Sequence, residues 1–264
     1  MSLSPTLNIA LKAARKAANI INRAALDLGT LKVRQKASHD FVTEIDRAAE
    51  KIIIETLMDA YPNYSILAEE SGKSKNESEF QWIIDPLDGT TNFIHGFPHY
   101  AISIALAHNG VVEQALIFDP NKNELFTATK GAGAFLNEKR IRASKRTQMG
   151  ESLIGTGFPF RENDNIPQFL NILNALFEQS SGVRRAGAAS LDLAYVACAR
   201  FEGFFEFGLK PWDVAAGALL VLEAGGLVSS LPENENYLQT GNILAASPKI
   251  FPQILNIIQT STVN

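Results

Sequence analysis

Residues 82–92 read WIIDPLDGTTN and place two carboxylates three residues apart behind a short apolar run. The Trp-Ile-Ile run suits a buried strand, and Pro86, which has no N–H to donate, is expected to end the hydrogen-bond ladder. Asp85 and Asp88 would then lie at the carboxyl end of that strand. Gly89 lets the backbone approach a ligand closely, and the N–H groups after it could open a short helix whose N-terminus favours an anion.

Two carboxylates beside an anion site point to a cation held between them and a phosphoryl group. Mg²⁺ in proteins is usually bound by a few carboxylates together with substrate phosphate oxygens. In phosphate-ester hydrolysis one ion can generate hydroxide from water while another stabilises the leaving alkoxide, so no Ser, Cys or His nucleophile is needed. Taken alone, the Asp-Pro-Leu-Asp-Gly sequence is also typical of a simple turn, because these residue types are the usual turn formers.

Two other acidic segments accompany this motif, AEESG at Ala68–Gly72 and KPWDVAAG at Lys210–Gly217. In this order the three segments resemble the inositol monophosphatase family, and the resemblance covers nearly the whole chain. It is closest to the bacterial branch, because Arg184–Gly187 and Gly203–Asp213 have the character of that branch.

The resemblance implies a site for two to three Mg²⁺ ions. Its ligands would be four carboxylates and one main-chain carbonyl, those of Glu69, Asp85, Asp88, Asp213 and Leu87 respectively. Without several cations, four ionised acids and a phosphate dianion would repel one another. Sequence spacing leaves open whether Glu69 or its neighbour Glu70 reaches the metal, and the alignment of AEESG with the family pattern favours the first.

The resemblance also implies which groups prepare the attacking water. It favours two roles at once for Thr90, as the N-cap of a helix and as a hydroxyl that orients water together with Glu69. Asp46 would hydrogen-bond Thr90 and hold it in place, although the residues alone would suggest an exposed helix charge. Asp213 lies near a predicted helix start, where an acid can also simply complement the helix dipole.

The substrate is expected to contact residues of the Asp-Gly-Thr-Thr turn and residues of the later segments between Arg184 and Asp213. The predicted contacts are Asp88, Gly89, Thr90, Thr91, Arg184, Gly187, Ala188, Ala189, Glu206 and Asp213. On the family pattern Glu206 would hold a ring hydroxyl, while the small residues 187–189 would let the ring approach. Ala188 replaces a hydroxyl residue common in animal members, so one polar contact would be missing. Arg184 could pair with Glu206, contact a second subunit, or be an exposed arginine at a strand end.

These implications together predict an enzyme, an inositol-phosphate phosphatase. It would be a Mg²⁺-dependent phosphomonoesterase that hydrolyses myo-inositol 1-phosphate or a similar small polyol phosphate by direct water attack. Relatives with the same fold hydrolyse fructose 1,6-bisphosphate, histidinol phosphate or 3′-phosphoadenosine 5′-phosphate, so these substrates stay open. The resemblance further implies inhibition by lithium and a homodimer.

A second hypothesis belongs to a different class of function. Bacterial relatives are implicated in transcription antitermination and ribosomal RNA maturation, which implies a contact with the transcription machinery. Retention of all four expected acids argues that catalysis persists beside any such binding role.

The composition is that of an ordinary globular protein. The chain has 264 residues, of which 46% are hydrophobic and 20% are charged, and its net charge is −4. This charge argues against general nucleic-acid binding. No apolar run approaches the roughly 20 residues of a membrane helix, and no signal peptide is evident, so we expect a cytoplasmic protein with no membrane partner.

The pattern of apolar residues predicts the elements that carry these groups. Two antiparallel helices are expected at residues 5–28 and 41–60. Strands follow as far as residue 129, with Asn109-Gly110 as a hairpin turn. Beyond a basic stretch, Lys139–Gly150, which is expected to be a charged edge strand and loop, strands and helices alternate to the end of the chain.

This order of elements predicts an α+β fold. The resemblance implies a layered αβαβα sandwich of the inositol monophosphatase and fructose-1,6-bisphosphatase type. Residues 1–145 would form an N-terminal α+β half with the Asp-Pro-Leu-Asp-Gly-Thr motif. Residues 146–264 would form a C-terminal α/β half with the Trp-Asp motif, and the site would lie at their junction.

Overall fold

Two long amphipathic helices open the chain. The computed structural model describes residues 3–30, 33–37, 40–159, 165–233 and 235–261. Helix α1 (Pro5–Ala24) begins where the Ser4 hydroxyl accepts the N–H of Leu7 at 3.2 Å. Helix α2 (Glu44–Ala60) begins at a capping box, in which the Thr43 hydroxyl accepts N–H groups of the first turn and the Asp46 carboxylate accepts the Thr43 N–H.

A large sheet lies against these helices. In spatial order its strands are β10 (Lys139–Arg140), β9 (Gly133–Leu136), β8 (Glu124–Thr129), β7 (Val111–Asp119), β6 (Ala101–His108), β5 (Phe80–Asp88), β3 (Ser65–Ala68) and β4 (Gly72–Lys73). Neighbouring strands are antiparallel except for the parallel pair β3 and β5. The predicted Asn109-Gly110 turn joins β6 to β7 with positive φ at both residues. The basic β10 is the edge strand that its charge pattern indicates.

A smaller sheet follows in the second part of the chain. Its strands, in spatial order, are β12 (Gly182–Arg184), β11 (Leu153–Thr156), β13 (Gly203–Glu206), β15 (Ile243–Ala246) and β14 (Leu227–Ser230). Strand β11 runs parallel to both of its neighbours, whereas β15 is antiparallel to both of its own. A separate antiparallel pair, β1 (Val33–Ala37) and β2 (Asp40–Thr43), precedes α2.

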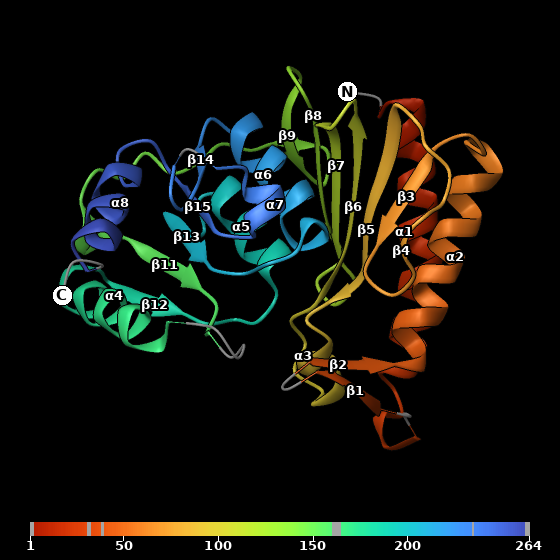
Figure 1. Cartoon of the computed structure of the whole chain (residues 1–264), viewed down its shortest axis with the longest axis horizontal. Coiled ribbons are helices and arrows are strands. Elements are labelled where there is room, and N and C mark those ends of the chain that lie inside the picture. The colour runs from red at the N-terminus through yellow and green to blue at the C-terminus, as the bar shows by residue number, and fades with distance from the viewer. Residues whose placement is uncertain (1–2, 31–32, 38–39, 160–164, 234, 262–264) are drawn as a thin grey trace.

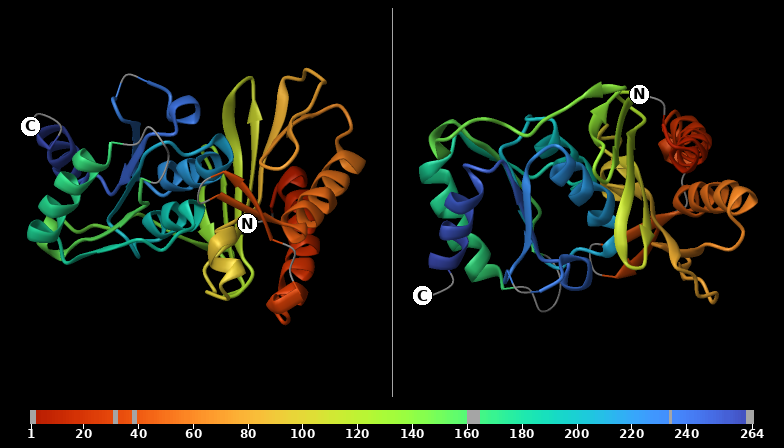
Figure 2. Two further views of the ribbon diagram at one scale, coloured as in Figure 1. Left: turned by 60° about the horizontal axis from the view of Figure 1, so that its bottom comes forward. Right: turned by 90° about the horizontal axis from the view of Figure 1, so that it is seen from above.

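The remaining helices are α3 (Thr90–Ile94), α4 (Ile166–Gln179), α5 (Ala189–Ala197), α6 (Pro211–Glu223), α7 (Tyr237–Thr240) and α8 (Phe251–Thr260). Figure 1 shows the layers side by side: α4 with α8, the smaller sheet, α5 with α6, the larger sheet, and α1 with α2. The two views in Figure 2 show the same succession, with the C-terminus on the α8 side. The expected α+β class and αβαβα layering are therefore confirmed.

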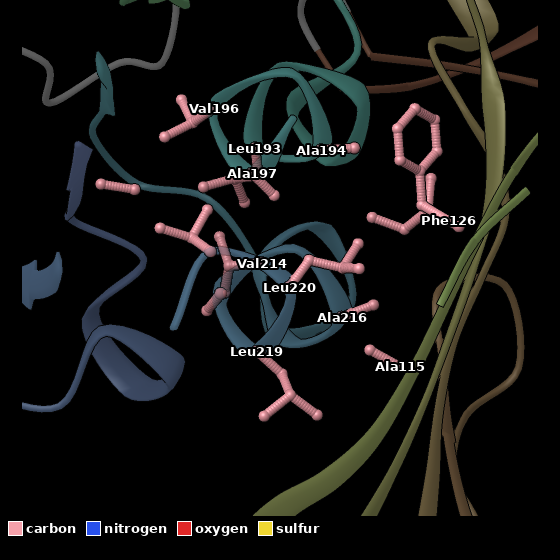
Figure 3. Close-up of a cluster of buried hydrophobic side chains, with 14 of the residues drawn as sticks. Ala115, Phe126, Leu193, Ala194, Val196, Ala197, Val214, Ala216, Leu219 and Leu220 are labelled. Atoms are coloured by element: carbon pink, nitrogen blue, oxygen red, sulfur yellow. The ribbon is translucent and has the colours of Figure 1, made fainter. Parts of the chain in front are cut away.

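Each space between layers has its own hydrophobic core. The central cluster surrounds α5 and α6, where Leu193 and Val214 pack together and Phe126 reaches in from the larger sheet (Figure 3). Both helices are buried on nearly every side, so their apolar residues do not form a single stripe. This core joins elements from both sides of residue 145, and a division into halves there remains a proposal.

Several predicted boundaries are wrong for identifiable reasons. The predicted helix 41–60 begins only at Glu44, because Thr43 caps it and the preceding residues pair in β2. The ladder of β5 does not end at Pro86, because a bulge between Asp85 and Asp88 lets the strand continue until Asp88 pairs with Ala101. In the described part of the chain no helix is long and apolar enough to cross a membrane.

Candidate active site

The end of strand β5 forms the centre of the site. Asp85 is only 2% exposed, and its Oδ1 accepts the N–H of Leu87 at 2.9 Å across the bulge. The bulge thus supplies a backbone donor to a carboxylate that has left the solvent. It also brings Asp88 to the last position of the strand, as the sequence predicts.

The turn after β5 requires a glycine. Gly89 has a φ of 94° and caps α3 without any side chain. A Cβ there would lie 3.0 Å from the His99 carbonyl oxygen and 3.3 Å from that of Gly187, so both space and conformation exclude larger residues. The N-cap role expected for Thr90 is therefore wrong, because the left-handed Gly89 ends the turn one residue earlier and makes Thr90 the first helical residue.

The Thr90 hydroxyl is held by a buried acid. It donates to Asp46 Oδ1 at 2.8 Å and to the Leu87 carbonyl at 3.0 Å. Asp46 is fully buried, and its Oδ2 accepts the Thr43 N–H at 2.8 Å. The hydrogen bond that the family resemblance implies between Asp46 and Thr90 is thus present, and Asp46 is not an exposed helix charge. Its rotamer is fixed from two sides, which fixes the direction of the threonine hydroxyl.

Strand β3 brings a third acid beside Asp85. The N–H of Glu69 donates to the Ile84 carbonyl at 3.2 Å, so the chain continues alongside β5 after β3 ends. Burial raises the pKa of the Asp85 carboxyl, and among the neighbouring charges that of Glu69 adds most to the rise. Glu70 instead has its carboxylate 4.0 Å from Arg47 Nε, and its N–H donates to the buried Glu50 at 2.8 Å. This arrangement favours Glu69 over Glu70 as the acid that faces the site.

The second part of the chain contributes Asp213 and Glu206. Asp213 is the third residue of α6, and its Oδ2 accepts the Lys210 N–H at 2.7 Å, so it does complement a helix start. Glu206 ends β13 and lies against Gly157, where a Cβ would be 2.0 Å from the glutamate Cδ. Burial raises the pKa of the Asp213 carboxyl, and the charges of Asp88, Glu69 and Glu206 add to the rise.

Hydrogen bonds across the site connect the turn after β5 with the segment that enters α5. Asp88 Oδ2 accepts the backbone N–H of Ser190 at 2.7 Å and also the Ser190 hydroxyl. Asn92 Nδ2 donates to the Ala186 carbonyl at 2.9 Å. The segment that enters α5 therefore lies against the turn that follows β5.

The remaining predicted contacts differ in position. Thr91 is exposed on α3, and the Ala188 methyl group is buried in the central core, so only its backbone can face the site. Arg184 is exposed, and its guanidinium donates to the Val183 carbonyl, not to Glu206. Burial and the charges of Glu206 and Asp88 raise the pKa of the buried Asp192 carboxyl beside the site, and the charge of the neighbouring Arg185 partly offsets this rise.

The carboxyl groups at the centre of the site ionise less readily than in water, because their pKa values are raised. Burial raises the pKa of Asp85, Asp88 and Asp213, and mutual repulsion adds to the effect at Asp85 and Asp213. For Asp88 the pKa rises to about 6, although hydrogen bonds from Ser190 and Ala189 oppose the rise. A nearby cation would remove this penalty.

The donor set fits such a cation. Among the described residues, no three Asp, Glu, His or Cys side chains lie close enough together to hold a metal ion as they stand, and Asp85, Asp88 and Asp213 each direct one oxygen to a backbone N–H. Their second oxygens, together with the Leu87 carbonyl, are hard donors of the kind that Mg²⁺ prefers. Oxygen-only donors suit magnesium, whereas zinc sites in proteins usually include Cys or His ligands.

Sequence reasoning missed four side chains around the site. Glu50 lies one helical turn after Asp46, so the i, i+4 spacing could have revealed it. Asn92 and Ser190 act through contacts between segments about a hundred residues apart, and no local pattern signals these contacts. Asp192 is 1% exposed, and its Oδ1 accepts no hydrogen bond from the residues that the structure describes. Only its apolar neighbours in the sequence hint at this burial.

The raised pKa values predict how stability depends on pH. An acid whose pKa is raised by folding ionises more readily after unfolding, so the folded state loses stability as pH rises from the ordinary value of 3.8 toward the raised one. In EDTA we expect the melting temperature to fall between about pH 4 and pH 6, and Mg²⁺ should reduce or reverse that fall. Thermal melts at both pH values, with and without Mg²⁺, measure this. A melting temperature that rises with pH in EDTA would contradict the assignment.

Comparisons with known proteins identify one family. A model of the inositol monophosphatase family matches residues 2–262. The Nus factor SuhB of Pseudomonas aeruginosa is 51% identical over 262 residues, covering 97% of this chain and 97% of the relative. That of Escherichia coli is 48% identical over 254 residues, covering 96% and 95%.

Solved structures agree with this signal. The extragenic suppressor protein suhB from Bartonella henselae superposes with a TM-score of 0.94 at 40% identity, covering 97% of this chain and 99% of that one. A Thermotoga maritima IMPase superposes with a TM-score of 0.88 at 31% identity, covering 97% of each chain.

Proposed function

Because the chain belongs to the inositol monophosphatase family, we propose that it is a Mg²⁺-dependent phosphomonoesterase acting on myo-inositol 1-phosphate or a similar small polyol phosphate. The observation that carries the proposal is that three acids, Asp85, Asp88 and Asp213, have pKa values raised by burial, near a threonine hydroxyl that is held by the buried Asp46. Fructose 1,6-bisphosphate, histidinol phosphate and 3′-phosphoadenosine 5′-phosphate remain alternative substrates.

In this proposal each group has a distinct task. The cation ligands are Glu69, Asp85, Asp88, Asp213 and the Leu87 carbonyl. Two to three Mg²⁺ ions, when bound, would lower the pKa of the attacking water and stabilise the leaving oxygen. Thr90, held by Asp46, would orient the water from the side of α3. The first N–H groups of a helix have no partner within the helix, so those of α3 would bind the phosphate.

The polyol would lie on the other side of the site. The backbone of Gly187–Ala189 would face it, and Glu206 would accept a ring hydroxyl. Ala188 lacks the hydroxyl common in animal members, but two residues later Ser190 has a hydroxyl, which donates to Asp88.

We place Arg184 at the surface, where a second copy of the chain could contact it in the homodimer that the family resemblance implies. Light scattering of the purified protein tests the dimer.

Phosphate release from a panel of small esters tests the function directly. Each of the proposed esters is assayed with Mg²⁺, with EDTA, and with lithium added to Mg²⁺. We expect release only with Mg²⁺, inhibition by lithium, and the fastest turnover on the inositol ester. Equal release in EDTA would reject the metal-dependent mechanism, and faster turnover of another ester would reassign the substrate.

Glu206→Ala separates recognition of the polyol from the chemistry. A lost charged hydrogen bond is worth about 1.5–3 kcal/mol, so kcat/KM for inositol 1-phosphate should fall about 10- to 150-fold. The value for an aryl phosphate, which lacks the hydroxyl, should change little. Asp213→Ala is the contrasting variant and should impair both esters alike, because the cation serves every phosphate ester. Equal losses from Glu206→Ala would make Glu206 a supporting residue of the metal site.

A second candidate function rests on the relatives. Those at 48–51% identity are named Nus factor SuhB, which supports a contact of this chain with the transcription machinery. Co-purification with bacterial RNA polymerase and its elongation factors tests it, using the normal protein and an Asp85→Asn variant. Retention by both proteins would support binding that does not depend on catalysis. Retention by neither would remove this candidate.

A further inference from the structure

We propose that Asn92 is a positioning residue whose side-chain amide sets the distance between the phosphate turn and the polyol-facing segment. The phosphate turn is Gly89–Thr91, and the polyol-facing segment is Ala186–Ser190. The inference rests on the proposed function, because it assumes that a phosphate ester spans these two segments. It assigns to Asn92 a part in substrate recognition without any direct contact to the reacting atoms.

The amide of Asn92 joins three stretches of backbone. Its Nδ2 donates to the carbonyl oxygens of His99 at 2.8 Å, Ala186 at 2.9 Å and Gly187 at 3.3 Å. The first acceptor lies in the loop before β6, and the other two lie more than 90 residues away in the chain. One amide group therefore ties α3, which begins at the phosphate turn, to the segment that enters α5.

The backbones meet closely at this point. Gly187 has a φ of 90°, and a Cβ there would lie 3.1 Å from Asn92 Nδ2. On the facing turn, a Cβ on Gly89 would lie 3.3 Å from the Gly187 carbonyl oxygen. Two glycines in left-handed conformations thus approach each other with the asparagine amide beside them. Because the two backbones are so close, we expect loss of the Asn92 amide to change the distance between the phosphate turn and the polyol-facing segment.

Other contacts hold the ends of these segments. The Ser190 N–H donates to Asp88 at 2.7 Å, which anchors the far end of the polyol-facing segment. Thr90 is anchored separately by Asp46. The Asn92 amide therefore controls the near end of the polyol-facing segment, whereas the groups that prepare water and cation are held by β5 and α2. Removing the amide should disturb recognition of the polyol more than the chemistry.

Asn92→Asp tests this with almost no change of shape. The variant replaces both N–H donors by a carboxylate oxygen that faces three carbonyl oxygens. We expect kcat/KM for myo-inositol 1-phosphate to fall about 10-fold more than that for para-nitrophenyl phosphate, as loss of a recognition contact predicts. Equal losses for the two esters would overturn the inference, because a purely structural role affects both alike.

Asn137→Ala is the matched control. Its side chain also holds a turn, since Asn137 Oδ1 accepts the Leu125 N–H at 2.9 Å, but this turn joins β9 to the edge strand β10. The ratio of the two kcat/KM values should stay at its wild-type value in this variant. If Asn92→Asp does not fold, Asn92→Ala removes the donors without adding repulsion. Failure of both variants to fold would overturn the inference in favour of a folding role.

The outcome can be separated from failure of the proposed function. If the wild-type protein hydrolyses neither ester, the proposed function has failed, and the same ratio is measured as binding affinities by calorimetry. A larger loss of inositol 1-phosphate binding in Asn92→Asp would then still support the inference. Equal losses, or a wild-type protein that binds neither ester, would overturn it.

Discussion

Asp85→Asn should abolish phosphate release and at the same time raise the melting temperature measured in EDTA. Asp85 is 2% exposed, and both burial and repulsion from Glu69, Asp88 and Asp213 raise its pKa. The neutral amide removes these penalties and keeps an oxygen for the Leu87 N–H. The same change removes a cation ligand, so we expect activity to fall about 10³-fold or more, as loss of several kcal/mol of transition-state stabilisation predicts.

The stability effect distinguishes a cation ligand from an ordinary buried acid. Each kcal/mol gained corresponds to about 2–4 °C in melting temperature for a chain of this size. Mg²⁺ should stabilise the wild-type protein by binding the folded state, and this shift should largely disappear in Asp85→Asn. Differential scanning fluorimetry in EDTA and in Mg²⁺ measures both effects.

Asp192→Asn is the control for this experiment. Asp192 is also buried, and burial and the charges of Glu206 and Asp88 raise its pKa, but it is not a proposed ligand. The control should raise the melting temperature in EDTA and keep the Mg²⁺-induced shift. If Asp85→Asn also kept the Mg²⁺-induced rise in melting temperature, Asp85 would not be a cation ligand, and its assignment to the metal site would be wrong.

How much of the fold could be predicted depended on the length and regularity of each element. The apolar pattern predicts helices at Ile166–Gln179 and Pro211–Glu223, and these bounds match α4 and α6, because each helix has a proline in its first turn and then a continuous apolar pattern. The strands predicted at Ser65–Ala68 and Glu124–Thr129 match β3 and β8. The short helix expected after Gly89 is present as α3. Other short elements, such as β4 and α7, were not predicted, because a few residues carry no measurable periodicity and contacts with neighbouring elements create them.

In the candidate site, the acids could be predicted from the sequence, but most of their hydrogen-bond partners could not. Its acids stand out locally, since each of them lies in a short polar motif at the end of a strand or the start of a helix. The groups that hold these acids do not stand out. Asp88 meets Ser190 across 102 residues and Thr90 meets Asp46 across 44, and only the family resemblance pointed to the second pair. Long-range partners are set by how the layers pack, which a single sequence does not display.

Thr90→Val should impair turnover nearly as strongly as loss of a ligand, while leaving the cation in place. Valine has almost the shape of threonine but cannot donate to Asp46 Oδ1 or to the Leu87 carbonyl. If the hydroxyl orients the attacking water, kcat should fall about 10²- to 10⁴-fold, the range for groups that manage a proton in the transition state. Calorimetry should show Mg²⁺ binding within a few-fold of wild type, since no proposed ligand is removed.

A double-mutant cycle with Asp46→Asn decides whether the two residues act as one unit. The amide oxygen can replace only one of the two acceptors that Asp46 offers, to Thr43 and to Thr90, so one hydrogen bond must be lost. If Asp46 acts through Thr90, the double variant should be no slower than the worse single variant. Thr90→Ser, which keeps the hydroxyl, should recover most of the activity. Additive losses in kcat would mean that Asp46 serves α2 alone, and that the water is oriented by other groups.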